Sequence, residues 1–143
     1  MSKSIAPQLS AIPGLVFSLT IQPIPTATTS KSAALGGNSL GLEPSSDGAL
    51  VLCLLSTTWD TQADDAQIAS TVQNLNTQII GAAKAKGLFD EWGYLNYAAE
   101  FQDPIGGYGA MISARLRAVS QRYDPGQAFQ KNVPGGFKLY SQK

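Results

Sequence analysis

The sequence predicts an α+β fold in which a small, mostly antiparallel sheet is covered on one face by two long helices. Segments with alternating apolar and polar residues indicate strands, and segments with apolar residues every three or four positions indicate helices. Clusters of glycine and proline separate these segments. A chain of 143 residues can bury one core, so we expect a flexible arm over residues 1–13 and a single domain over residues 14–143.

Three segments are predicted to form strands. The first, residues 15–22, is apolar on one face and polar on the other, and a Pro-Ile-Pro sequence starting at Pro23 should end it. The second, residues 49–59, is apolar on both faces before it becomes amphipathic, and Cys53 in its middle is expected to be a buried, inert thiol. The third, residues 92–98, alternates aromatic and small or polar residues.

Two long helices follow from the apolar periodicity. The first covers about residues 60–86, with Asp60 as its N-cap and Gly87 as its stop. The acidic pair Asp64-Asp65 near its start should interact with the helix dipole rather than bind a metal ion. The second helix covers residues 109–122 and packs through one apolar face.

The composition excludes several classes of function. The chain has no histidine and one cysteine, which rules out Ser–His and Cys–His catalysis, an internal disulfide and a thiolate zinc site within it. A net charge of zero without a basic stripe argues against nucleic-acid binding. The sequence has neither a signal-peptide pattern nor an apolar run long enough for a membrane span, so we expect a cytoplasmic protein. Gly36-Gly37 predicts a tight turn rather than a phosphate loop.

Neutral polar and aromatic side chains suggest a small-molecule pocket. The densest cluster is Tyr94-Leu95-Asn96-Tyr97, whose phenols and amide can donate hydrogen bonds, so Tyr94, Asn96 and Tyr97 are the catalytic candidates. The substrate-binding candidates are Phe17, Ser18, Thr20, Gln22, Thr57, Trp59, Gln102 and Asp103. Two alternatives stay open: the polar sheet face is solvated or covered by a partner, and the tyrosines serve only in packing.

The last third contains five motifs in a fixed order: Tyr94-Leu95-Asn96-Tyr97, Phe101-Gln102-Asp103-Pro104, Tyr108-Gly109, Tyr123-Asp124-Pro125 and Pro134-Gly135-Gly136-Phe137. Together they resemble the C-terminal end of fungal FAD-linked oxidoreductases of the berberine-bridge-enzyme type, and the resemblance extends from about Gly14 to Leu139. It implies a truncated oxidoreductase: half of an oxidase-type substrate domain, without the flavin-binding domain. It also implies that Asn96 and Tyr97 lie on the flavin side of the pocket.

The residues and the resemblance together lead to a function. We expect a cofactor-free cyclase or isomerase of fungal secondary metabolism, a pericyclase that performs a Diels–Alder-type cyclisation of a polyene-like substrate activated by a hydrogen bond. In an isomerisation Glu91, Glu100 or Asp103 would serve as acid or base. The alternatives are a non-catalytic pseudoenzyme that binds a ligand or complements a partner, and the C-terminal part of a split FAD-dependent oxidase.

The same reasoning sets the expected partners. No cofactor and no metal ion is expected, and the ligand should be a small natural-product intermediate. Half a sheet leaves an open edge, which favours pairing with another strand, so we expect a homodimer.

Overall fold

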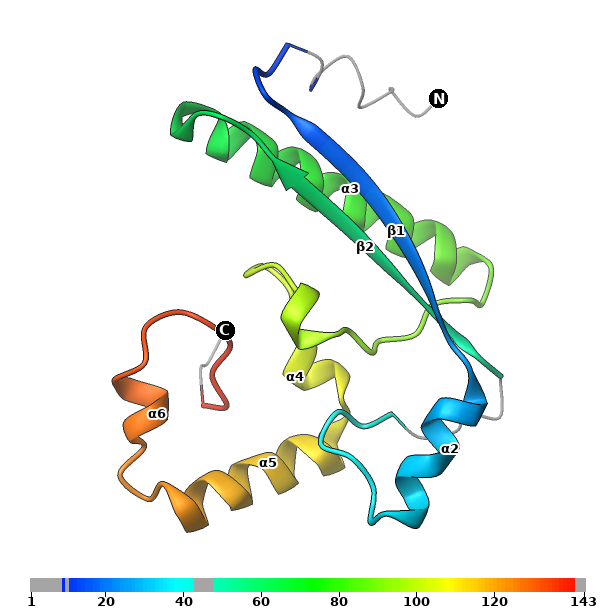
Figure 1. Ribbon diagram of the computed structural model, residues 1–143, viewed down its shortest axis with the longest axis vertical. Coiled ribbons are helices and arrows are strands. Elements are labelled where there is room, and N and C mark those ends of the chain that lie inside the picture. The colour runs from blue at the N-terminus through cyan, green and yellow to red at the C-terminus, as the bar shows by residue number, and fades with distance from the viewer. Residues whose placement is uncertain (1–8, 10, 43–47, 141–143) are drawn as a thin grey trace. The chain divides into compact units, whose positions relative to one another are not determined.

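The computed structural model describes residues 9, 11–42 and 48–140, and divides into two compact units (Figure 1). The first unit comprises residues 1–22 and 53–90, and the second comprises residues 23–52 and 91–143, so far as each is described. Most of the arm predicted over residues 1–13 lies outside the described residues. Two residues of that stretch, Leu9 and Ile12, are buried in the first unit.

The sheet consists of two antiparallel strands, β1 (Val16–Ile24) and β2 (Leu50–Thr58), so the predicted α+β class is confirmed. A hydrogen bond of 2.8 Å joins the hydroxyls of Ser18 and Ser56 across the two strands. β1 ends at Ile24, within the predicted Pro-Ile-Pro stop and two residues beyond the predicted strand end at residue 22, so Pro23 lies inside the strand. A proline lacks the N–H donor of a ladder, and a strand with one unpaired edge tolerates that loss.

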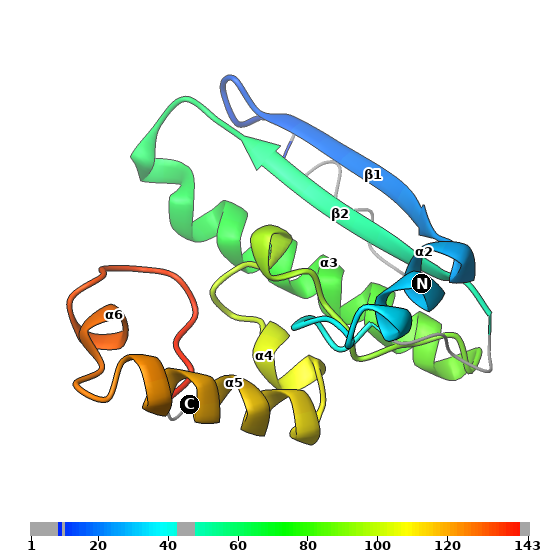
Figure 2. The ribbon, with the colours of Figure 1, turned by 60° about the horizontal axis from the view of Figure 1, so that its bottom comes forward.

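Helix α3 (Asp65–Ala85) lies along the sheet and follows a 3-10 turn at Gln62–Asp64 (Figures 1 and 2). Its end matches the prediction. Gly87 has a φ of +66°, its N–H donates to the Lys84 carbonyl, and the Leu88 N–H donates to the Ala83 carbonyl, which is the Schellman pattern.

The predicted N-cap of this helix is wrong, because Thr61 and Asp64 occupy the capping positions. The carboxylate of Asp60 lies instead over Gly14. The first turn of α3 carries Asp65, as the dipole argument expects, and this carboxylate also accepts a 2.7 Å hydrogen bond from the indole N–H of Trp59.

The core of the first unit is small. Leu9, Ile12 and Ile68 form its buried cluster, and Leu15, Trp59 and Val72 pack against it. β1 contributes little to this core, since eight of its nine residues are exposed. Cys53 of β2 is also exposed, which corrects the prediction of a buried thiol. The alternation of β2 was identified correctly, but a sheet of only two described strands leaves part of its apolar surface uncovered.

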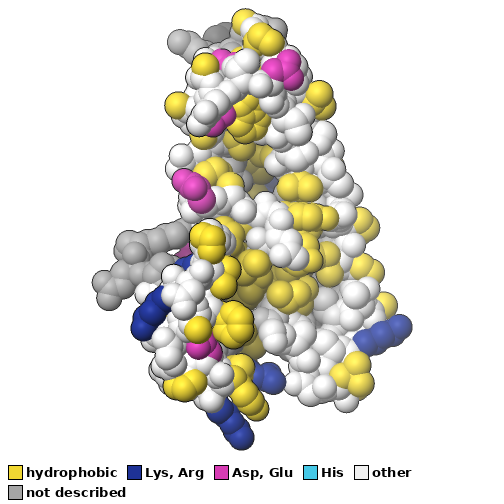
Figure 3. Space-filling view, turned by 60° about the vertical axis from the view of Figure 1, so that its left-hand side comes forward, with side chains coloured by type: hydrophobic (Ala, Val, Ile, Leu, Met, Phe, Trp, Pro, Cys, Tyr) yellow, Lys and Arg dark blue, Asp and Glu magenta, His cyan; other side chains and the backbone are white. Residues whose placement is uncertain are grey.

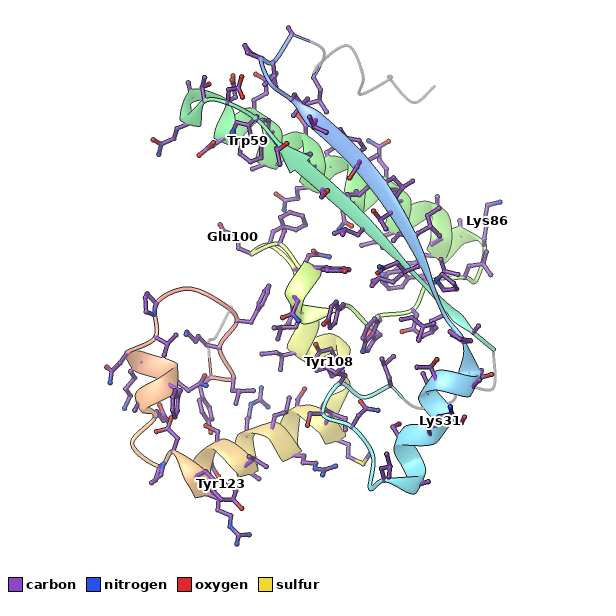
Figure 4. All side chains as sticks on the ribbon, viewed as in Figure 1. Lys31, Trp59, Lys86, Glu100, Tyr108 and Tyr123 are labelled. Atoms are coloured by element: carbon purple, nitrogen blue, oxygen red, sulfur yellow. The ribbon has the colours of Figure 1, made fainter. Side chains whose placement is uncertain are left out.

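The second unit is mainly helical. It contains α2 (Thr26–Ala34), a 3-10 turn at Leu95–Tyr97, α4 (Pro104–Gly107), α5 (Ala110–Tyr123) and α6 (Ala128–Lys131). α5 occupies the predicted range and contacts α4, where the buried hydroxyl of Ser113 donates to the Ile105 carbonyl at 2.7 Å. Tyr123, the last residue of α5, projects from the end of the helix and is 75% exposed (Figure 4).

The third predicted strand does not exist. Residues 91–94 have no regular secondary structure, and Leu95–Tyr97 forms a 3-10 turn closed by a hydrogen bond from the Tyr97 N–H to the Tyr94 carbonyl. The alternation of aromatic residues that predicted a strand has another cause. Trp92 stacks on both Tyr94 and Tyr108, so side-chain packing rather than a strand ladder holds this segment.

The surface in Figure 3 carries many hydrophobic and neutral side chains and few charged ones, in keeping with a chain in which 14% of residues are charged. In the described part of the chain, no helix combines the length and apolar character that crossing a membrane requires.

Candidate small-molecule pocket

The second unit contains a cavity of about 290 Å³ that is partly open to solvent. Its walls come from a loop after α2, the segment around the 3-10 turn, α4, α5 and the C-terminal segment. The lining residues are Ser39, Leu40, Tyr94, Leu95, Asn96, Ile105, Tyr108, Leu116, Phe137 and Leu139. None of them carries a charge, so the cavity is an apolar space with a few neutral polar groups, as small-molecule sites commonly are.

Asn38 organises the loop that brings Ser39 and Leu40 to the cavity. Its side-chain oxygen accepts hydrogen bonds from the N–H groups of Leu40 and Leu42, at 2.9 and 3.2 Å, and its amide donates to the Leu42 carbonyl at 2.8 Å. The same amide donates to the Ser32 hydroxyl at the end of α2. This pattern explains why the loop is ordered without secondary structure of its own.

The predicted turn at Gly36-Gly37 is confirmed in a specific form. Gly36 has a φ of +88°, and the Gly37 N–H donates to the Ser32 carbonyl at 2.8 Å, which ends α2. These glycines therefore terminate a helix, and the backbone N–H groups of the following loop point to Asn38.

Trp92 joins this loop to the aromatic segment. Its indole N–H donates to the Leu40 carbonyl at 2.8 Å, and its ring stacks on Tyr94 and Tyr108 with centroid distances of 6.2 and 6.4 Å. Such a stack fixes the orientation of two phenols that line the cavity. The tryptophan side chain thereby positions the wall without lining the cavity itself.

Both phenol oxygens accept an N–H from the 3-10 turn. The side-chain amide of Asn96 donates to the Tyr94 hydroxyl at 2.8 Å, and the backbone N–H of Leu95 donates to the Tyr108 hydroxyl at 3.3 Å. Tyr108 is 6% exposed, and burial raises its pKa; the Leu95 hydrogen bond opposes this rise and nearby Tyr94 adds to it. The buried phenol of Tyr108 (labelled in Figure 4) is therefore neutral at neutral pH.

The C-terminal segment is tied to α5 across the remaining wall. The guanidinium of Arg117 donates to the Leu139 carbonyl at 3.0 Å, and the Tyr140 hydroxyl donates to the Arg117 carbonyl at 3.1 Å. The Leu139 N–H donates to the side chain of Gln130 at 2.8 Å. These bonds hold Phe137 and Leu139 against the cavity.

Part of the predicted site comes together in the second unit. Tyr94 and Asn96 line the cavity, and Tyr97 meets the Tyr94 ring edge-on at 4.9 Å. Gln102 and Asp103 do not line it, and each accepts a backbone N–H: Gln102 from Ala99 at 2.9 Å, and Asp103 from Gly106 at the start of α4 at 3.1 Å.

The other predicted substrate-binding residues belong to the first unit. Ser18, Thr20 and Gln22 are exposed on one face of β1, whereas Phe17 and half-buried Thr57 lie on the opposite face of the sheet. Trp59 packs on the core cluster. The candidates therefore fall into two groups, one in each unit.

Sequence reasoning missed several parts of the pocket wall. Asn38, Leu40 and Tyr108 received no functional role, although Asn38 follows two glycines, which is a typical place for a side chain that organises a turn. Tyr108 sits just before Gly109, whose φ is +85°, at the junction of α4 and α5. Across residues 9, 11–42 and 48–140, no group of three acidic or cysteine side chains is placed to hold a metal ion.

Comparison with known proteins relates the chain to segments of longer fungal proteins. It is 39% identical over 121 residues to an FAD-dependent monooxygenase, FUP4, of Fusarium proliferatum, which covers 85% of this chain and 23% of the relative. It is 38% identical over 135 residues to an oligopeptidase, PhomG′, of Diaporthe leptostromiformis, covering 93% of the chain and 11% of the relative. It is 31% identical over 133 residues to a bifunctional solanapyrone synthase of Alternaria solani, covering 93% of the chain and 25% of the relative.

The chain spans less than a third of the length of the curated relatives that it matches. Most of these relatives are named FAD-dependent monooxygenases, so the chain is similar to a segment of such enzymes. No protein-family model matches it. No solved structure matches it either.

The residues present do not form a complete site for FAD. Its pyrophosphate requires several N–H donors or cations, but the cavity has no charged lining residue. In the glycine-containing loop, the N–H groups of Leu40 and Leu42 are bonded to Asn38, and that of Gly37 is bonded to Ser32. Three of the N–H groups that could hold a phosphate in this loop are therefore already used within the described chain.

Proposed function

We propose that the chain is the substrate-side, C-terminal portion of a fungal FAD-dependent oxidoreductase of the berberine-bridge-enzyme type, acting in secondary metabolism. The flavin-binding residues would lie outside these 143 residues, either on the same polypeptide or on another. A cytoplasmic location is part of this proposal. The function rests on the similarity to segments of FAD-dependent monooxygenases over most of this chain.

The exposure of β1 also supports this proposal. A two-stranded sheet with one strand exposed along eight of nine residues is marginal by itself, and sheets usually need three strands or a covering layer. The exposed apolar residues of β1 are Val16, Phe17, Leu19 and Ile21. Such a surface fits a sheet whose remaining neighbours are supplied from elsewhere.

Complementation tests this function. The chain is purified alone and after co-expression with the Fusarium relative from which the matching segment has been deleted. We expect a colourless chain alone and a co-purifying complex with the visible absorbance of bound flavin. Stoichiometric flavin on the chain alone, or a deleted relative that binds flavin without retaining the chain, would contradict the proposal.

A second candidate is a cofactor-free cyclase or isomerase that folds a polyene-like substrate in the pocket of the second unit. The uncharged cavity and its phenol and amide groups favour it, because pericyclic reactions need substrate folding and a hydrogen bond to an activating group. In the complementation experiment, turnover of such a substrate by the colourless chain would favour this candidate over the flavin-dependent one.

We further propose that β1 pairs with β1 of a second copy, which gives a homodimer. The strand is nearly symmetric in chemistry about Leu19: Ser18 would face Thr20 of the second copy, and Phe17 would face Ile21. No residue of β1 carries a charge, so nothing in the strand repels its own copy, whereas open edges are commonly guarded by charge. An isologous contact of this kind requires such self-complementarity.

Cysteine cross-linking tests the strand pairing. In a Cys53→Ser background, Leu19→Cys places the new thiol opposite itself across the two-fold axis, so an intermolecular disulfide should form rapidly. Phe17→Cys is the matched control, because residue 17 would face residue 21 and not itself. A monomer by sedimentation at micromolar concentration, or equal cross-linking of both variants, would contradict the dimer.

A further inference from the structure

The two tyrosines of the cavity share an unusual hydrogen-bonding state. Each phenol oxygen accepts an N–H from the turn at Leu95–Tyr97: Tyr94 from the Asn96 side chain, and Tyr108 from the Leu95 backbone. In the part of the chain that the structure describes, no group accepts the proton of either hydroxyl. A phenol has one proton to donate, and an N–H that occupies its oxygen leaves this proton available for another acceptor.

The surroundings of these two protons define the ligand. Most of the other lining residues are apolar, and Ser39 and Asn96 add neutral polar groups. The apolar ones are Leu40, Leu95, Ile105, Leu116, Phe137 and Leu139. A charged ligand would lose part of its hydration in such a cavity without gaining a counter-charge, because no lining residue is acidic or basic. A neutral ligand with an acceptor oxygen loses little hydration free energy on entering the cavity. Its oxygen can accept a hydrogen bond from a phenol hydroxyl.

We propose that Tyr94 and Tyr108 form a two-phenol donor site that binds an uncharged, mainly apolar ligand through its carbonyl oxygen. The cavity of about 290 Å³ has room for a small ring system or folded polyene segment. Asn96 acts as a positioning residue, because its N–H orients the Tyr94 hydroxyl with the proton outward. Hydrogen bonds in such a chain polarise one another, so the amide strengthens the phenol as a donor.

This inference deepens the second candidate function, the cofactor-free cyclase, and names the group that would activate its substrate. It does not depend on turnover or on flavin. If the chain binds carbonyl ligands selectively but converts none of them, the result supports the two-phenol donor site and contradicts the cyclase function. The test therefore measures binding alone.

The experiment uses two probes of the same shape, 2-acetylnaphthalene and 2-isopropenylnaphthalene. The first has a carbonyl oxygen where the second has a methylene group. Binding to the full chain is followed by NMR through the indole N–H of Trp92, which stacks on both phenols, and the side-chain amide of Asn96. We expect the ketone to bind about fivefold to tenfold more tightly than the alkene, as one neutral hydrogen bond implies.

Three variants assign the effect. Tyr94→Phe should reduce the preference for the ketone, and Tyr94→Phe combined with Tyr108→Phe should abolish it. Tyr123→Phe, at a 75% exposed position on α5, is the matched control and should leave it unchanged. If the double variant loses its dispersed NMR spectrum, Tyr94→Phe alone decides. Equal binding of both probes, absence of binding, or an unchanged preference in Tyr94→Phe would overturn the proposal.

Discussion

Replacing Ile68 with alanine is expected to lower the free energy of unfolding of the first unit by about 3 kcal/mol. Ile68 is 1% exposed and is the largest fully buried side chain in the described chain. Its cluster contains only two other buried apolar residues, Leu9 and Ile12. Because so few groups surround it, the cavity left by truncation removes a large share of the packing in this unit.

Urea denaturation followed by far-UV circular dichroism and by fluorescence measures this loss, since Trp59 packs on the same cluster. Ile79→Ala is the matched control on the same helix, at a position that is 39% exposed, and should cost well under about 1.5 kcal/mol. Equal losses in the two variants would mean that the Ile68 cluster does not hold the first unit together.

Replacing Gly41 with alanine is expected to destabilise the second unit by about 3 kcal/mol and to disrupt the pocket. Gly41 has a φ of +70°, which costs an L-residue about 1–2 kcal/mol. An alanine Cβ would also lie 2.6 Å from the Tyr108 carbonyl oxygen and 3.3 Å from Ile112 Cγ1. A backbone oxygen cannot turn away as a side chain can, so the loop itself has to move.

Gly36→Ala separates the two costs. Gly36 also has a positive φ, +88°, but an added Cβ would meet nothing within 4 Å. This variant should therefore be destabilised only by the cost of a positive φ for an L-residue. Thermal unfolding gives the stability difference, and the NMR signal of the Trp92 indole N–H, bonded to Leu40, reports the loop position. If both glycine variants behave alike, the close approach to Tyr108 does not constrain the loop.

Local sequence signals predicted those features that depend on neighbouring residues. The alternation of β1 and β2 and the periodicity of α3 and α5 are visible within each segment, and Gly87 marks the end of α3 because only its own backbone conformation matters there. Asp60 was chosen as a cap from its residue type, but its carboxylate lies over Gly14, a residue distant in sequence. Local patterns cannot reveal such a contact.

The pocket was predicted in part for the same reason. Tyr94 and Asn96 stood out by their chemistry, and both line the cavity. The third strand was wrong because alternating aromatic residues suit a strand and an aromatic stack equally well. The link that decides between them, from Trp92 to Leu40, joins residues 52 positions apart. Cys53 was expected to be buried because its neighbours are apolar, but its exposure depends on how many strands cover it.

The uncovered strand β1 also has a consequence for the abundance of this protein in the cell. An uncharged, exposed strand is the kind of segment that chaperones retain and proteases remove when its partner is missing. Copies made in excess of their partner would be degraded, so the steady-state amount of the chain would follow the amount of whatever completes its sheet. Where a separate chain that carries the flavin-binding residues completes the sheet, the supply of that chain, rather than the rate of synthesis of this one, would limit how much of the protein accumulates.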